Sequence, residues 1–178
     1  MKQKVLLLHG WGGSDNPHWQ SWLASEIAKE YGKVSFLKFS DFDFPNKDVW
    51  KEELLKELDD FKPDIVICHS LANILWFHLC NEEKISKVKK LYLVAPPSIE
   101  REIKEVKSFF PVHAPKDLHA KEVLLICSTN DPYMSIEEAK SLQKTLNVEM
   151  EVLEGAGHLN ADSGFGPWPW MLNKLKLV

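Results

Sequence analysis

The sequence predicts a single domain of the α/β class, in which about six mostly parallel strands are flanked by helices on both faces. Short apolar runs of strand length alternate along the chain with longer amphipathic runs, which is the pattern of successive strand–helix–strand units. The 178 residues suit one domain with a substantial core, and no linker or internal repeat divides them. We therefore expect one domain over residues 1–178, with its binding site at the carboxyl ends of the strands.

Composition and charge narrow the class of protein. The net charge of −4 disfavours a nucleic-acid partner, because binding to phosphates requires a basic surface. No apolar run approaches the roughly 20 residues that span a bilayer, and the first run stops at His9-Gly10 without the cleavage site of a signal peptide. Three widely spaced cysteines suit reduced thiols rather than a disulfide framework. These features predict a cytoplasmic protein without a membrane partner.

The first half of the chain predicts two strands, each followed by a helix. Residues Lys4–Leu8 form a short apolar strand, and residues Val34–Phe39 form the second. We expect Asn16 to cap the first helix and Pro17 to occupy its first position, which suits both residue types. The apolar faces of the two helices are marked by Trp19, Trp22, Leu23 and Ile27, and by Trp50, Leu54, Leu58 and Phe61.

The second half continues the alternation with less regular connections. A short helix and a turn are expected over Asn81–Lys90, and residues Ser98–Ala120 are the least regular part, with one short helix at about 99–108. Ser135 and Glu138 form a capping box at the start of a later helix. The other elements are expected to be a strand ending at Cys68, a helix over Leu71–Cys80, strands at Leu91–Ala95, Val123–Cys127 and Val148–Leu153, and a final helix at about Trp168–Leu175.

Ser70 stands at the junction between an apolar strand and the helix that follows it. A serine there, with small residues two positions to either side, is the pattern of a nucleophile elbow, a strained strand-to-helix turn that exposes the hydroxyl. The flanking residues are Cys68 and Ala72, where glycine is more usual. Both are small enough to let the backbones of the strand and the helix approach each other. An ordinary turn is the alternative that this segment alone leaves open.

Two further strand ends supply the partners that a nucleophilic serine requires. Asp131 follows the fifth strand and His158 follows the sixth, so the order along the chain is serine, acid, histidine, as in α/β-hydrolases. An imidazole must accept the serine proton, and a carboxylate must fix the tautomer of that imidazole. Asp162 is a competing acid on the same loop as His158. Each residue alone could belong to a plain turn, but all three in order predict a hydrolytic triad.

The glycine-rich loop after the first strand is the expected place for an oxyanion hole. The backbone N–H groups of Trp11 and Leu71 are predicted to hold the developing negative charge of the substrate carbonyl oxygen. A tight turn without this function is one alternative. A dinucleotide-binding loop is another, but Gly10, Gly12 and Gly13 do not fit the G-x-G-x-x-G frame.

Several segments together carry a resemblance to a known family: His9–Gly13 with Trp19 and Trp22, Pro45 with Trp50, His69-Ser70-Leu71, Asn130-Asp131-Pro132, and Gly157–Ala161 with Gly164, Trp168 and Pro169. The chain resembles the small, lidless serine hydrolases of the retinoblastoma-binding protein 9 and YdeN type over nearly its whole length. The resemblance implies a minimal α/β-hydrolase fold with strand order 2-1-3-4-5-6, catalytic roles for Ser70, Asp131 and His158, and no cofactor. Residues 125–129 lack the glutamate of the retinoblastoma-binding motif, so that partner is not expected.

The predicted activity is hydrolysis of small acyl esters or amides through an acyl-enzyme on Ser70. Residues 96–121 are too few and too rich in proline for a multi-helix lid, so short acyl chains are expected. Trp11, Phe109 and Phe110 are predicted to line the substrate pocket. A binding or scaffold protein with little turnover is the alternative from another class.

Other reactive residue types receive structural interpretations. Cys68 and Cys127 end buried strands and are expected to be inert core thiols, because a reactive cysteine needs an exposed, electropositive setting. His113 and His119 do not form a metal-binding spacing with nearby carboxylates, so no metal site is predicted.

Overall fold

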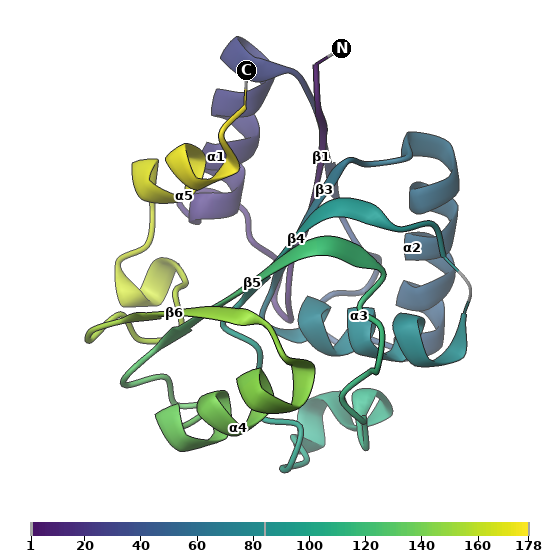
Figure 1. Cartoon of the computed structure of the whole chain (residues 1–178), viewed down its shortest axis with the longest axis vertical. Helices are drawn as coiled ribbons and strands as arrows, with labels where there is room; N and C mark the ends of the chain where they lie inside the picture. Colours follow the sequence, from purple (N-terminus) through teal and green to yellow (C-terminus); the bar gives the residue numbers. More distant parts are fainter. Residues whose placement is uncertain (1, 84, 178) are drawn as a thin grey trace.

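The computed structural model describes residues 2–83 and 85–177, and a six-stranded sheet forms its centre (Figure 1). All neighbouring strands pair in parallel in the order β2-β1-β3-β4-β5-β6, which confirms the predicted fold class and strand order. The strands are β1 (Lys4–Leu8), β2 (Lys33–Leu37), β3 (Ile65–His69), β4 (Val88–Val94), β5 (Ala120–Ser128) and β6 (Glu149–Leu153). Because they run the same way, their carboxyl ends share one edge of the sheet.

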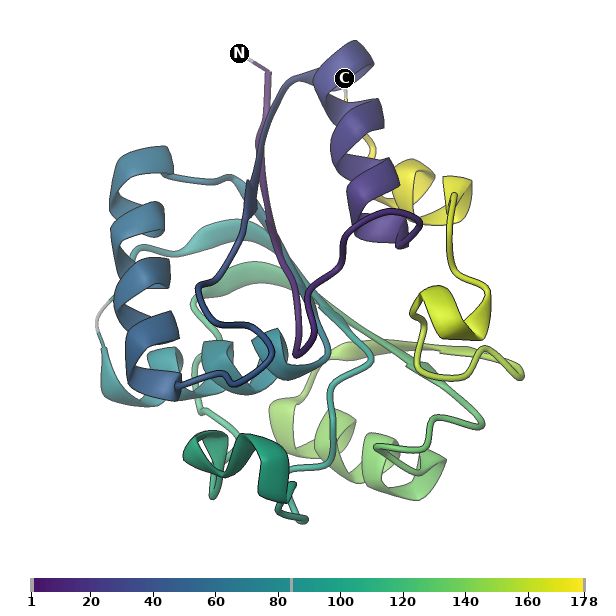
Figure 2. The same ribbon diagram turned by 180° about the vertical axis from the view of Figure 1, so that it is seen from behind.

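Helices cover both faces of the sheet (Figures 1 and 2). The α-helices are α1 (Trp19–Glu26), α2 (Lys47–Phe61), α3 (Leu71–Glu82), α4 (Ile136–Leu146) and α5 (Pro169–Leu175). A π-helix η1 (Ile27–Tyr31) extends α1, and two 3₁₀-helices, η2 (Lys104–Phe109) and η3 (Ala161–Ser163), lie in loops. Helices α1 and α5 pack on one face of the sheet, and α2, α3 and α4 pack on the other.

Alternation of side chains along the buried strands builds the two layers of the core. In β1, Val5 and Leu7 belong to the cluster beneath α1 and α5, whereas Leu6 and Leu8 belong to the cluster beneath α2 and α3. All four side chains are inaccessible to solvent. Four consecutive apolar residues in one strand are therefore the expected consequence of a parallel sheet covered on both faces.

The first helix begins later than the sequence predicts. Asn16 was expected to cap it and Pro17 to open it, but α1 starts at Trp19 with His18 as its N-cap. The reason is local, because His18 has an extended backbone and its Nδ1 accepts a hydrogen bond from the Gln20 N–H at 3.1 Å. An imidazole nitrogen here accepts the N-cap hydrogen bond that a serine or asparagine side chain usually accepts.

The connections on either side of β4 also differ from expectation. Helix α3 continues to Glu82 and β4 begins at Val88, so the described part of residues 81–90 contains no separate short helix; Lys84 lies outside the described residues. The helix expected at about 99–108 is replaced by η2, in which Val106 has non-helical φ and ψ of −124° and 33°. The Ser98 hydroxyl accepts the Glu100 N–H, and this side-chain contact competes with a helical turn.

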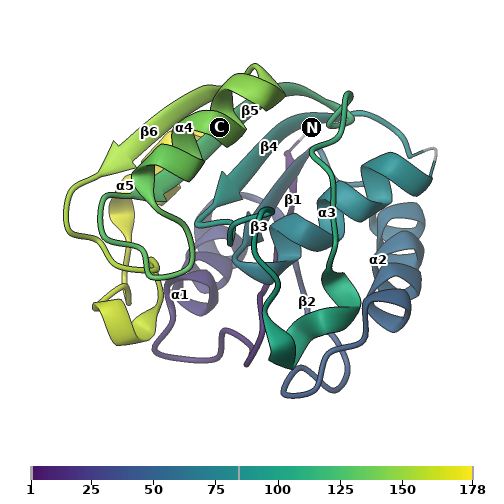
Figure 3. The same ribbon diagram turned by 90° about the horizontal axis from the view of Figure 1, so that it is seen from below.

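Segment 96–118 lies against α2 and α3 near the carboxyl edge of the sheet (Figure 3). The Lys47 N–H at the start of α2 donates to Ser108 Oγ, and the Phe109 carbonyl contacts His78 Nε2 of α3 at 2.8 Å. The predicted capping box is confirmed, because Ser135 and Glu138 form it at the start of α4. Within the described residues, no helix has both the length and the apolar character needed to cross a membrane.

Candidate active site

Ser70 occupies a strained turn between β3 and α3. Its φ of 54° and ψ of −123° lie in a region that residues with a side chain rarely adopt. The Ser70 N–H donates to the Val94 carbonyl at 3.0 Å, and Asn73 Nδ2 donates to both the Ser70 and Val94 carbonyls at 2.8 and 2.9 Å. Hydrogen bonds from both sides of the turn therefore hold it against the end of β4.

Small residues surround the turn, and the closest approach comes from the loop after β1. Cys68 and Ala72, the predicted flanks, are fully buried. A Cβ atom added at Gly10 would lie 2.7 Å from Ser70 Cβ and 3.2 Å from the Leu71 nitrogen. Such contacts are shorter than van der Waals distance, so only glycine fits at position 10 without displacing the elbow.

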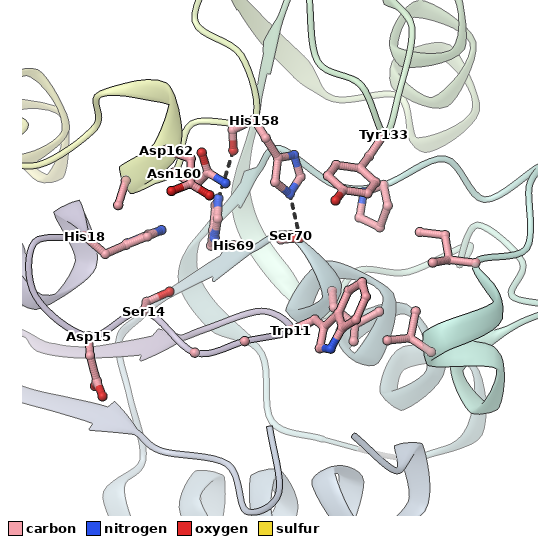
Figure 4. A pocket seen from close by; sticks show the side chains of 17 residues that line it. Trp11, Ser14, Asp15, His18, His69, Ser70, Tyr133, His158, Asn160 and Asp162 are labelled. Carbon is pink, nitrogen blue, oxygen red and sulfur yellow. Dashed lines mark hydrogen bonds between the residues drawn. The ribbon is translucent and has the colours of Figure 1, made fainter. Parts of the chain in front are cut away.

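The side chains of Ser70, His158 and Asp131 form one chain of hydrogen bonds (Figure 4 shows the part from Ser70 to His158). The distance from His158 Nε2 to Ser70 Oγ is 2.7 Å, and His158 Nδ1 lies 2.9 and 3.0 Å from the two Asp131 oxygens. A carboxylate can only accept, so Nδ1 carries the hydrogen and Nε2 is left to accept from the Ser70 hydroxyl. The Asp131 side chain is 2% exposed and that of His158 is 8% exposed, which excludes water from their contact.

The turn after β5 holds the loop that carries His158. Three consecutive backbone N–H groups donate to three consecutive side chains: Gly155 to Thr129 Oγ1 at 3.0 Å, Ala156 to Ser128 Oγ at 2.9 Å, and Gly157 to Asn130 Oδ1 at 2.7 Å. On the other side, the His158 N–H donates to Ser163 Oγ. The acid and the histidine therefore meet because the two loops that bear them are tied together directly.

Two further residues support His158: Tyr133, which the sequence did not single out, and His69, which precedes Ser70 in the chain. The Tyr133 ring packs against the His158 ring with centroids 4.5 Å apart, and the Tyr133 N–H donates to Asp131 Oδ1 at 2.9 Å. His69 Nε2 donates to the His158 carbonyl at 3.1 Å. Burial lowers the pKa of His69 well below its ordinary value, so this ring stays neutral. The only signal for Tyr133 is its position two residues after Asp131, where an aspartate turn places a backbone N–H.

Asp162, the competing acid, lies in η3 on the rim of the same pocket. The hydrogen bonds of His158 Nδ1 go to Asp131, which reaches the ring from the neighbouring loop. The geometry thus favours Asp131 as the partner of the histidine.

A pocket of about 440 Å³ opens beside Ser70. On one side of Ser70 in Figure 4 lie the polar residues Ser14, His18, Asn160 and Asp162, and on the other lie Trp11 and Tyr133. Trp11 also lines the pocket, and its indole Nε1 donates to the Asp43 carbonyl at 3.0 Å.

The structure corrects the expectation that Phe109 and Phe110 line this pocket. Phe109 is fully buried and packs edge-on against Trp50, with ring centroids 5.4 Å apart, and Phe110 belongs to the same core cluster. Ile103 and Val106, three to seven residues earlier in the same segment, line the pocket in their place. The expectation assumed a regular helix, whereas η2 is interrupted at Val106 by non-helical φ and ψ, so the spacing of side chains in this segment is not that of an α-helix.

The backbone groups expected to form an oxyanion hole are available. The loop after β1 is held by the Gly12 N–H on the Phe42 carbonyl and the Gly13 N–H on the Gly10 carbonyl. In the part of the chain that the structure describes, no acceptor is found for the N–H of Trp11 or of Leu71. Both residues line the pocket at Ser70, and Leu71 opens helix α3, whose N-terminal dipole favours negative charge.

The cysteines are unsuited to act as nucleophiles. Burial raises the pKa of Cys68 and raises that of Cys127 to about 12. A thiol that stays protonated at neutral pH is a weak nucleophile, so neither Cys68 nor Cys127 competes with Ser70 as the candidate nucleophile.

Comparison with known proteins agrees with this geometry. The family described as serine hydrolase matches residues 5–177. No curated protein matches the chain. Among solved structures, a YdeN-like hydrolase from Pectobacterium atrosepticum is 27% identical, with a TM-score of 0.81 over 97% of this chain and 89% of the other. The ydeN gene product of B. subtilis is 18% identical, with a TM-score of 0.83 over 97% and 96% of the two chains.

A more distant similarity extends to the esterase domain of a Rhodothermus marinus protein, which is 16% identical with a TM-score of 0.63 over 91% of this chain and 80% of the other. At this identity the likeness concerns the fold. The family match over nearly the whole chain is the stronger finding and confirms the resemblance expected from the sequence. The chain belongs to the serine hydrolase family.

Proposed function

We propose that this protein hydrolyses small acyl esters or amides through an acyl-enzyme on Ser70, with His158 as general base and acid and Asp131 as the residue that orients His158. The observation that carries the proposal is the hydrogen-bond chain from Ser70 Oγ through His158 to Asp131, with distances of 2.7 and 2.9 Å. Nucleophile and base are within reach of each other, and the base is oriented by a third group.

In the acylation step, Ser70 Oγ attacks the carbonyl carbon of the substrate while its proton moves to His158 Nε2. The carbonyl oxygen takes the negative charge of the tetrahedral intermediate and accepts hydrogen bonds from the N–H groups of Trp11 and Leu71. When the intermediate collapses, the bond to the leaving group breaks and His158 returns its proton to the departing oxygen or nitrogen. Asp131 stabilises the imidazolium that exists between these two proton transfers.

In the deacylation step, water takes the place of the leaving group. His158 removes a proton from the water, the resulting hydroxide attacks the acyl carbon, and Ser70 leaves with the proton that His158 gives back. The products are a carboxylic acid and free enzyme. Each step needs only groups that the pocket supplies, together with water and the acyl substrate.

The proposal is tested by covalent labelling with a fluorophosphonate probe and by hydrolysis of a panel of esters, amides and thioesters. Labelling on Ser70, located by mass spectrometry, and its loss in Ser70→Ala together with esterase activity are the expected results. Ser40→Ala is the matched control, because Ser40 is exposed and lies outside the pocket. Labelling that persists in Ser70→Ala, or labelling on Cys68, would refute the assignment. A protein that neither labels nor turns over would instead be a binding protein with the fold of a hydrolase.

A further inference from the structure

The pocket beside Ser70 contains two buried polar groups that the proposed mechanism does not use. In the described residues, Ser14 Oγ and His18 Nε2 have no hydrogen-bond partner. Both residues line the pocket, yet Ser14 is only 4% exposed and His18 only 5%. Figure 4 shows both side chains on the same side of Ser70, directed toward His69. Buried polar groups are normally paired, so two polar atoms without a hydrogen-bond partner in the lining of one pocket require an explanation.

The hydrogen-bonding character of His18 follows from its role at the helix terminus. Its Nδ1 accepts from the Gln20 N–H at 3.1 Å, so Nε2 carries the hydrogen of the neutral ring. Burial, with a smaller effect of His158, lowers the pKa of His18 to about 4, and the ring is therefore uncharged near pH 7. His18 thus presents a fixed N–H donor without a positive charge.

Ser14 lines the same pocket as this donor and can complement it. Its backbone carbonyl accepts from Ser21 Oγ at 2.6 Å, which fixes the loop to α1 and leaves the Ser14 hydroxyl free to donate or accept. The pair therefore offers one N–H donor and one hydroxyl that can donate or accept. An oxygen atom of a ligand can accept hydrogen bonds from both groups.

The surrounding charges decide what kind of oxygen fits. Asp15 and Asp162 line the same pocket, and the ion pair of Asp15 with Lys38 involves side chains that are 75% and 62% exposed. Among the described residues, those that line the pocket include no lysine or arginine, so a carboxylate or phosphate of a substrate would approach these acidic side chains without a compensating cation. A neutral oxygen meets no such penalty.

We propose that Ser14 and His18 form a polar subsite that binds a neutral oxygen of the substrate, a hydroxyl, ether or carbonyl oxygen close to the scissile carbonyl. This inference rests on the proposed function and narrows its substrate class to oxygen-substituted acyl esters or amides, or to those with an oxygen-substituted leaving group. A site with buried polar groups discriminates against analogues that leave these groups unpaired.

Two pairs of isosteric esters test the subsite, one for each side of the scissile bond. On the acyl side, p-nitrophenyl methoxyacetate is compared with p-nitrophenyl butyrate. On the alcohol side, 2-methoxyethyl butyrate is compared with butyl butyrate. Values of kcat/KM are divided by the rates of alkaline hydrolysis, which corrects for intrinsic reactivity. We expect a preference for the oxygen member of about 10-fold in one pair, the effect of a hydrogen bond or two.

Variants show whether the two side chains cause that preference. Ser14→Ala removes the hydroxyl, and His18→Asn removes the donor from the pocket floor while asparagine still caps the helix. Each should lower the oxygen preference at least about threefold. Ile103→Ala in the apolar part of the pocket is the control, and it should affect both members of a pair alike. Thermal unfolding verifies that each variant is folded.

A binding measurement decides the subsite independently of turnover. In Ser70→Ala protein, ligand-observed NMR gives the Kd of intact 2-methoxyethyl butyrate and of butyl butyrate, and also of methoxyacetamide and butyramide. Tighter binding of one oxygen-containing ligand, lost on adding His18→Asn, supports the subsite even if hydrolysis fails. Equal affinities in both pairs, or a preference that both variants retain, would overturn it. Ser70 labelling with no oxygen preference would leave the proposed function standing without the subsite.

Discussion

The substitution Gly10→Ala tests whether the elbow is positioned by the loop after β1. The new Cβ would lie 2.7 Å from Ser70 Cβ, and ordinary contact begins at 3.4 Å, so one of the two backbones must move by about 0.7 Å. Moving the Ser70 backbone costs free energy, because hydrogen bonds to Val94 and Asn73 hold it in place. A displacement of 1 Å at a reacting group can cost about 100-fold in rate, so we expect kcat to fall about 10- to 100-fold.

The control for this prediction is Gly32→Ala. Its Cβ would meet the Gln3 carbonyl oxygen at 2.9 Å, a comparable clash at the start of β2, at the opposite end of the strands. Overpacking of this kind typically destabilises a protein by about 1–3 kcal/mol, so both variants should lose stability in denaturant unfolding. Activity on p-nitrophenyl butyrate, measured where both are folded, should fall for Gly10→Ala alone. Equal activity of the two variants would mean that Gly10 does not position the nucleophile.

Three further predictions follow from the same geometry. Asp131→Asn should lower kcat by on the order of 10⁴, by favouring the wrong histidine tautomer, whereas Asp162→Asn should cost far less; steady-state kinetics would expose a reversed order. Because the pKa of His18 falls from 6.5 to about 4 on folding, the unfolded chain binds more protons between these values, and lowering the pH through this range should reduce the free energy of unfolding by up to roughly 3 kcal/mol. Denaturant unfolding of His18→Asn should show a weaker pH dependence; an unchanged one would contradict this. Since the pocket holds only about 440 Å³ and its lining mixes apolar residues such as Trp11, Ile103 and Val106 with polar ones, kcat/KM for p-nitrophenyl esters should peak at about two to six acyl carbons, and a peak at twelve would refute it.

The strands and the candidate catalytic residues could be proposed from the sequence because strong local rules govern them. A strand segment buried on both faces must be apolar throughout, as in residues 5–8 of β1 and 65–68 of β3, and its ends are marked by polar or turn residues. Serine, aspartate and histidine are among the few side chains that perform acyl transfer, so Ser70, Asp131 and His158 could be recognised from residue type and order. The structure brings these three into contact.

The connections could not be predicted because competing local contacts decide them. Nothing in the pattern indicates that His18 rather than Asn16 caps α1, since imidazole is an uncommon cap. The alternation of apolar residues in segment 98–110 permits a regular helix, and only tertiary contacts such as that of Phe109 with Trp50 reveal that the phenylalanines point into the core. The lining of the pocket therefore required the three-dimensional arrangement.

The unusual flanks of the elbow show where its steric requirement lies. A glycine on each side of the serine is the usual pattern because strand and helix backbones come close there. In this chain Cys68 fills a fully buried place in the core and Ala72 is an ordinary helical residue, so neither position needs a backbone without Cβ. The position that tolerates no side chain is Gly10, in the loop after β1. A Cβ atom there would clash with Ser70 Cβ and the Leu71 nitrogen. The N–H of Leu71 and the hydroxyl of Ser70 can share one pocket with Trp11 because Gly10 lets the two loops approach so closely.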